Sequence, residues 1–150
     1  MPADYDGDGI SDLAVWRPSD ATCVTNNTYA IQWGMAGDVP VPDDYDGDGR
    51  TDLAVFRPAD LRRYVLPSNG GGSYFLSTNN ISIQVAGDYD GDSQADFIGW
   101  SSSSGVWSGW LSGTGKQLSQ EWGIPGDLPL GVGSIEEPLR RGRMPVEPIP

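Results

Sequence analysis

Several residue types that carry common enzyme chemistry are missing or scarce in this chain. Histidine is absent from the 150 residues, which removes the most frequent general base and excludes imidazole ligands for zinc or copper. The single cysteine, Cys23, excludes a disulfide within the chain, and we expect it to be buried or half-buried, with a bridge to another chain as the alternative. The sequence contains no nucleophile elbow and no phosphate-binding loop. It therefore predicts a protein that is not an enzyme.

Long apolar runs and helical periodicity are also missing. No stretch approaches the roughly 20 apolar residues of a membrane-spanning helix. The first residues do not resemble a secretion signal, so we expect either a signal that has been removed or a chain that is part of a longer protein. Glycine and proline are abundant instead, with 21 and 12 residues. This composition is typical of short strands joined by tight turns and predicts an all-β fold.

Positive charge is scarce, and the negative charge is clustered. The net charge is −12 and the pI is near 4.1, which makes nucleic acid and anionic membrane surfaces poor partners. Three short loops, beginning at Asp4, Asp44 and Asp88, hold 12 of the 21 acidic residues. A need for solubility does not explain such clustering, whereas cation binding does.

The three acidic loops mark an internal repeat. They are 40 and 44 residues apart, a spacing in the range of β-propeller blades. Each loop leads into a continuous apolar run, at residues 13–16, 53–56 and 97–100, which predicts strands covered on both faces. Second strands are expected near residues 22–25, 63–66 and 106–111, and third strands ending at 32–34, 83–85 and 121–123. A Gly-Asp-x-Pro connector follows at residues 37–42 and again at 126–130.

Each acidic loop has aspartates at its first, third, fifth and ninth positions. Glycines permit a tight curl that aims alternate side chains at one ion, and hard oxygen ligands in this number favour Ca²⁺. The twelfth position is apolar or glycine, which disfavours an EF-hand and favours a loop between strands. The predicted ligands are Asp4, Asp6, Asp8, the Ile10 carbonyl and Asp12; Asp44, Asp46, Asp48, the Arg50 carbonyl and Asp52; and Asp88, Asp90, Asp92, the Gln94 carbonyl and Asp96.

The third loop departs from the other two at one position. Ser93 stands where they have Gly9 and Gly49. A left-handed conformation at a non-glycine residue costs about 1 kcal/mol. We therefore predict that the third site is the weakest.

The motif Asp-x-Asp-x-Asp-Gly-x-x-Asp-Leu-Ala-Val, together with Trp-Gly-x-x-Gly-Asp-x-Pro connectors at Trp33 and Trp122, resembles the FG-GAP/VCBS repeats, which are related to the integrin α-subunit propeller. The resemblance covers roughly residues 2–130. It implies four-stranded β-propeller blades, each with a calcium loop between strands, and an extracellular setting. Members of the family typically have about seven blades, whereas this chain has about three to four, an incomplete ring. That departure predicts an oligomer, a fragment or an open array.

We divide the chain into a β-repeat domain, residues 1–133, and a Pro-rich extended tail or linker, residues 134–150. Read head to tail, the C-terminus followed by the N-terminus resembles the lead-in to the second loop at residues 39–44. This indicates a tail that completes the first blade of its own chain or of a neighbour, or one unit of a tandem array; a chance likeness is the alternative.

The favoured hypothesis is a non-enzymatic, calcium-binding, secreted or cell-surface module for structural assembly or adhesion. Its expected partners are other subunits, by self-association, or cell-surface proteins and glycans. The alternative is a lectin-like propeller that binds carbohydrate, or an accessory module of a secreted polysaccharide-active enzyme. Trp107 and Trp110, near Ser/Gly-rich turns, are the candidate ligand-binding residues. Asn26 and Asn80 begin candidate N-glycosylation triplets.

Overall fold

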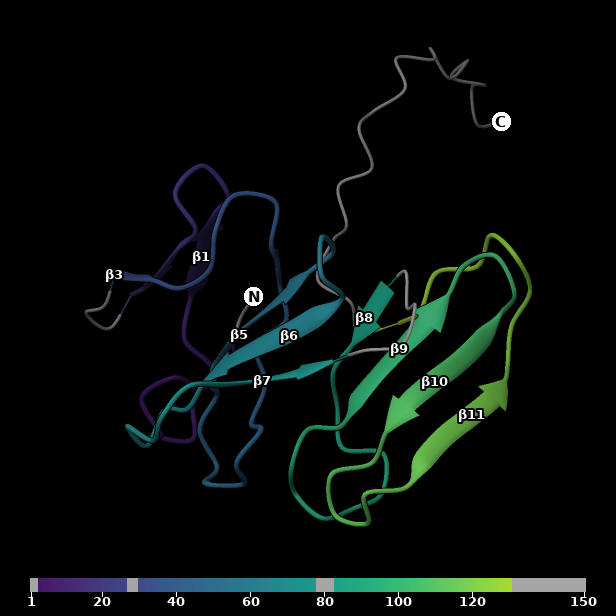
Figure 1. Ribbon diagram of the computed structural model, residues 1–150. Helices are drawn as coiled ribbons and strands as arrows, with labels where there is room; N and C mark the ends of the chain where they lie inside the picture. The colour runs from purple at the N-terminus through teal and green to yellow at the C-terminus, as the bar shows by residue number, and fades with distance from the viewer. Residues whose placement is uncertain (1–2, 27–29, 78–82, 131–150) are drawn as a thin grey trace, which may run out of the picture.

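The chain forms three antiparallel sheets that follow one another along the sequence (Figure 1). The computed structural model describes residues 3–26, 30–77 and 83–130. Within these ranges there are eleven strands and no helix, which confirms the all-β prediction. Accordingly, no described segment forms a helix that could cross a membrane.

Each sheet is a meander in which strands adjacent in sequence are paired. Sheet 1 consists of β1 (Ala14–Arg17), β2 (Thr22–Thr25) and β3 (Ala30–Gln32). Sheet 2 consists of β4 (Val39–Pro40), β5 (Leu53–Arg57), β6 (Arg62–Leu66) and β7 (Tyr74–Ser77). Sheet 3 consists of β8 (Ile83–Val85), β9 (Phe97–Ser101), β10 (Val106–Trp110) and β11 (Gln117–Glu121). The second and third acidic loops thus lie between strands, as predicted, and connect the first two strands of sheets 2 and 3.

The assignment of residues 83–85 to the third strand of the second repeat is wrong. That segment is β8, the first strand of sheet 3, and β7 is the third strand of sheet 2. The reason lies in its side chains, because Ile83 and Val85 are buried against Trp100 of β9. The connector at residues 37–42 likewise contributes a strand to the sheet that follows it, because β4, which lies in this connector, pairs with β5.

The prediction that all three apolar strands are covered on both faces fails for β1. It holds for β5 and β9, whose central residues are buried. In β1, Val15 is 61% exposed, and Leu13 just before it is 70% exposed. Burial here comes from contact with the preceding sheet, because Val55, the counterpart of Val15, is 1% exposed and lines a cavity with residues of sheet 1, and β9 follows sheet 2. Among the described residues no sheet precedes sheet 1 (Figure 1).

The main core lies between sheets 2 and 3. Tyr45 stacks on Phe97 with ring centroids 5.2 Å apart. Between these sheets the fully buried Arg63 donates to the Gln84 side chain and to the backbone carbonyls of Asp96 and Ile98. Its guanidinium also lies over the rings of Tyr45 and Phe97, so aromatic faces and carbonyls surround the cation.

The seam between sheets 1 and 2 is less filled. A groove of about 310 Å³ runs along it and is lined by residues of both sheets, among them Cys23 and Leu66. Cys23 is only 8% exposed, which agrees with the expectation of a buried thiol, and burial raises its pKa.

Candidate metal centres

The three acidic loops share one pattern of backbone hydrogen bonds. In the first loop, Asp4 accepts from the N–H of Gly7 at 2.6 Å and of Gly9 at 2.8 Å. The same pair of bonds converges on Asp44 in the second loop and on Asp88 in the third. Both glycines of the first loop have φ of +82°, a region that L side chains rarely adopt. The sequence thus folds each loop into a curl around its first carboxylate.

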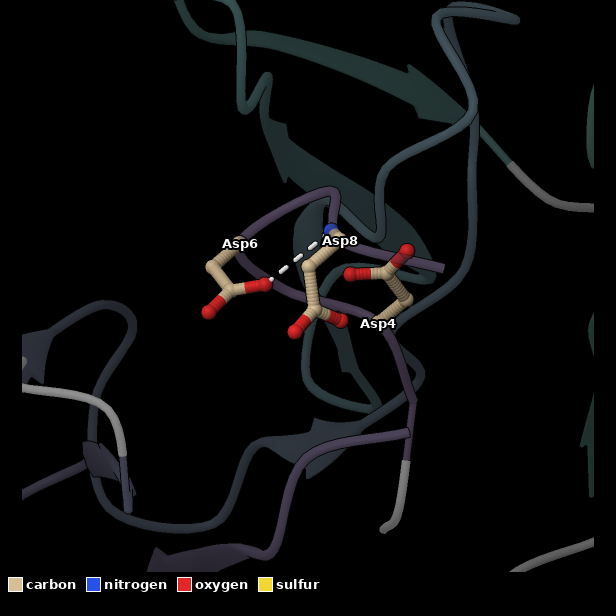
Figure 2. Close-up of side chains that lie close together, drawn as sticks. All are labelled: Asp4, Asp6 and Asp8. Atoms are coloured by element: carbon tan, nitrogen blue, oxygen red, sulfur yellow. Dashed lines mark hydrogen bonds between the residues drawn. The ribbon is translucent and has the colours of Figure 1, made fainter. Parts of the chain in front are cut away.

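Each curl brings three carboxylates together. One oxygen from each lies within 4.8 Å of the others, and Figure 2 shows the side chains of the first loop. Carboxylates at this separation repel one another, and the repulsion strengthens as water is excluded. The three groups are Asp4, Asp6 and Asp8; Asp44, Asp46 and Asp48; and Asp88, Asp90 and Asp96.

The electrostatics of these groups differ from member to member. Burial, followed by the charges of Asp92, Asp96 and Asp88, raises the pKa of Asp90. Both carboxylate oxygens of Asp90 are shielded from solvent and accept no hydrogen bond of standard geometry, although the nearby Asp92 N–H partly opposes the rise in pKa. Burial likewise raises the pKa of Asp46. In contrast, the backbone N–H groups of Ser93 and Gly91 lower the pKa of Asp88.

The fourth aspartate of each loop is buried and closes the loop. Asp12, Asp52 and Asp96 are at most 4% exposed, and each accepts from the backbone N–H of the tyrosine seven residues earlier. In the first two loops this residue lies outside the group of three. In the third loop it joins the group, and Asp92 lies outside. The structure therefore leaves Asp12, Asp52 and Asp92 out of these groups, and metal binding stays a prediction for all twelve aspartates.

Two serines that the sequence analysis missed complete the second and third loops. Ser68 donates its N–H to Asp52 at 2.7 Å and its hydroxyl to Asp48 at 3.0 Å. Ser112 bonds Asp96 and Asp92 in the same way. Both serines lie 16 residues after the fourth aspartate of their loop, and Thr28 has the same offset in the first repeat but lies outside the described residues. The sequence signal that could have identified these serines is a hydroxyl side chain 16 residues after the fourth aspartate in each repeat.

The seventh loop positions join neighbouring loops. The side chain of Arg50 lies against Gly7, and that of Gln94 against Gly47, so closely that a Cβ on either glycine would collide with it. Thr51 N–H donates to the Asp4 carbonyl at 2.7 Å, and Ala95 N–H to the Asp44 carbonyl at 2.6 Å. The loops therefore stack in register. Their own backbone carbonyls at Ile10, Arg50 and Gln94 stay predicted ligands.

Ser93 has the conformation that its place in the third loop requires. Its φ is +70°, against +82° at Gly9 and +86° at Gly49. The inference of backbone strain at this position is confirmed, while the lower affinity of the third site stays a prediction.

The two tryptophans proposed for a ligand surface do not form one platform. They are three residues apart on β10 and so point to opposite faces of sheet 3. Trp107 packs on the cluster of Ile83, Val85 and Trp100 and donates to the Trp122 carbonyl, whereas Trp110 is 43% exposed. Carbohydrate binding stays a hypothesis in which Trp110 is the accessible aromatic ring.

The first candidate glycosylation site lies at an exposed position beside β1. Asn26 is exposed, although its side-chain oxygen accepts from Leu13 N–H at 3.1 Å. Asn80 and the tail at 134–150 lie outside the described residues.

Comparison of the chain with family models, curated proteins and solved structures gives no match. The case for a function therefore rests on the loops themselves.

Proposed function

We propose that the protein is a calcium-stabilised, non-enzymatic β-repeat module of the secreted or cell-surface kind, with a role in structural assembly or adhesion. The observation that supports this most is the threefold recurrence of three carboxylates whose oxygens lie within 4.8 Å of one another. Asp90 adds to it, because its two shielded oxygens accept no hydrogen bond of standard geometry and are suited to a cation.

The chemistry of the loops favours Ca²⁺ over other ions. Carboxylates, backbone carbonyls and serine hydroxyls are all hard oxygen ligands, and flexible loops suit the irregular coordination of Ca²⁺ better than the strict octahedron of Mg²⁺. Binding would remove the repulsion within each loop and hold the strands on either side of it. Carboxylates committed to an ion are also poor proton shuttles, which supports a structural role rather than a catalytic one.

The three sheets correspond, in this proposal, to blades of the FG-GAP/VCBS type. Their order, the loop between the first two strands and the connectors at Trp33 and Trp122 support that view. Partly exposed loops suit the 10⁻⁴–10⁻³ M affinities typical of extracellular calcium modules, roughly matched to millimolar calcium outside cells. A secreted or cell-surface location is proposed on this basis.

Thermal unfolding with calcium and with a chelator tests the proposal. If the folded chain binds calcium and the unfolded chain does not, Tm rises with calcium by an amount set by RT ln(1 + [Ca]/Kd). We expect millimolar calcium to raise Tm by several degrees over EDTA and millimolar magnesium to raise it far less. Calorimetric titration should give three sites. Identical melting curves in calcium and in EDTA would refute the metal assignment.

A further inference from the structure

The connector after sheet 1 completes sheet 2 through three contacts. Its residues Val39 and Pro40, as β4, pair with Phe56 and Val55 of β5. Asp38 holds Arg57 through two hydrogen bonds, at 2.9 Å and 2.8 Å. In addition, the Trp33 indole donates to the Tyr64 carbonyl of β6 at 3.3 Å. The outer strand of sheets 2 and 3, β4 and β8 respectively, therefore comes from the chain that follows the preceding sheet.

The connector after sheet 3 has the same local turn, but within the described residues it pairs with no strand. Ile124 and Asp127 exchange hydrogen bonds of 3.0 Å and 3.1 Å, matching the 2.9 Å and 3.1 Å bonds between Met35 and Asp38. Asp38 is 6% exposed, whereas Asp127 is an exposed residue. Trp122 and Leu128, the counterparts of Trp33 and Val39, are 75% and 76% exposed.

Sheet 1 presents the complementary surface. Among the described strands β1 pairs with β2, and none lies along Val15 and Trp16 in the way that β4 lies along Val55 and Phe56. Arg17, the counterpart of Arg57, has a side chain that is 56% exposed, and the nearest carboxylate, Asp20, is 3.6 Å away. The Trp16 indole nitrogen is shielded and has no acceptor.

The acidic loops at the two ends of the array also have complementary surfaces, one on the loop of sheet 3 and one on the loop of sheet 1. On the sheet 3 side, the space at Gly91 is open, whereas the equivalent Gly7 and Gly47 are covered by the side chains of the next loop. On the sheet 1 side, Ile10, the counterpart of Arg50 and Gln94, is 68% exposed. One end of the array thus carries an unfilled glycine position and the other an apolar side chain with no loop beneath it.

We propose that sheet 3 of one molecule docks on sheet 1 of a second copy of this chain and repeats the seam between sheets 1 and 2. The proposal builds on the assembly role proposed above and assigns its contacts. Residues 128–129 add as an outer strand along β1, with Leu128 opposite Trp16 and Pro129 opposite Val15. Asp127 binds Arg17, the Trp122 indole bonds the Val24 carbonyl, and Ile10 covers Gly91.

The docking surface on sheet 3 and the one on sheet 1 do not meet within one molecule because they lie at its opposite ends. Sheets 1 and 3 flank sheet 2, and each sheet contacts the next through loops stacked in one direction (Figure 1). A contact between unlike surfaces is heterologous, so it adds molecules until a ring closes or a filament grows.

Sedimentation velocity of the full chain, over a concentration series in calcium, tests the proposal by a charge exchange. We expect the wild type to form species larger than a monomer at concentrations up to about 100 µM. The variants Asp127→Arg and Arg17→Asp should each weaken association roughly tenfold or more, because each brings like charges together. Mixed in equal amounts, they should restore it, since every junction in the mixture regains opposite charges. A Tm of each variant at low concentration within a few degrees of the wild type shows that the fold is intact, since Asp127→Arg also loses the turn bond from the Ile124 N–H.

A wild type that stays monomeric throughout, or a mixture that associates no better than its components, would overturn the proposal. A monomer in which Asp127→Arg and Arg17→Asp each lower Tm, and in which the double variant restores it, would also overturn it, because the connector would then complete sheet 1 of its own chain. Repeating the series in EDTA separates this result from the calcium proposal. If association persists while calcium leaves Tm unchanged, the result supports the docking surface and refutes the metal sites.

Discussion

Arg57 and Asp38 form a two-point ion pair that links the connector after sheet 1 to the end of β5. The Nε and one terminal nitrogen of Arg57 donate to the two carboxylate oxygens at 2.9 Å and 2.8 Å. The Asp38 side chain is 1% exposed and that of Arg57 is 18% exposed. This near-burial makes the pair costly to break from one side, because the remaining charge would lose its partner away from water.

Replacing Asp38 with Asn should destabilise the protein by about 2–3 kcal/mol, because Arg57 would lose its charged partner. The matched control is Asp127→Asn, in which the same turn binds no arginine among the described residues and the expected loss is about 1 kcal/mol or less. Urea unfolding at low protein concentration measures both. Equal losses in the two variants would show that the ion pair adds nothing beyond the turn.

Asp46→Asn should separate the calcium contribution from the loop's own stability. Burial raises the pKa of Asp46, so its charge is unfavourable in the folded loop without an ion. We expect Tm in EDTA to be unchanged or higher, and the increase in Tm on adding calcium to fall by roughly a third, since one of three sites is damaged. The control Glu121→Gln removes an exposed carboxylate outside the loops and should leave the calcium response unchanged. A full calcium response in the Asp46 variant would contradict a site in the second loop.

Ser93→Gly should stabilise the protein by about 0.5–1 kcal/mol. The substitution relieves a left-handed backbone conformation, and the greater freedom of glycine in the unfolded chain offsets part of the gain. The reciprocal change Gly49→Ser has open space around it, so its cost of about 1 kcal/mol would come from the backbone alone. Denaturant midpoints with EDTA measure both effects. A loss of stability in Ser93→Gly would mean that the serine side chain outweighs the strain.

Stability should fall as the pH rises from 10 to 12. Burial raises the pKa of Tyr45 from 10.0 to about 12, and its hydroxyl donates to the Val41 carbonyl at 2.7 Å. Since the folded pKa lies above the unfolded one, the stabilisation is complete below pH 10 and is lost as the pH approaches 12, with a total of about 2–3 kcal/mol. Urea midpoints across this range measure the loss. In Tyr45→Phe the loss should shrink, although the missing hydrogen bond costs about 1 kcal/mol at neutral pH.

Local chemistry was predictable from the sequence because the loops repeat. The positions of the acidic loops follow from aspartate spacing, and β1 and β5 end at Arg17 and Arg57, each followed by proline as expected. The strain at Ser93 was also predictable, because glycines at the same position in the other loops reveal the conformation that is needed.

The features that could not be predicted from the sequence depend on contacts between segments that are distant in the chain. The segment at Ile83 reads as the end of one repeat, yet burial against Trp100 assigns it to the next sheet. The exposure of Val15 follows from the lack of a described sheet before sheet 1 and not from the residues of β1, which closely match those of β5. Ser68 was missed because its role needs the hairpin to return it to the loop.

Arg63 gives the array a fixed order. The residue at its position, eleven after the fourth aspartate of the loop, is Cys23 in the first repeat and Trp107 in the third. Near-identical repeats are prone to pairing with the wrong neighbour during folding. A buried cation that bonds the Gln84 side chain and the Asp96 and Ile98 carbonyls accepts sheet 3 as its neighbour, because another repeat in that place would leave the charge without these acceptors. The acidic loops make the three repeats alike, whereas Arg63 favours one order of the sheets in space. Exchanging two repeats would leave its charge without these acceptors.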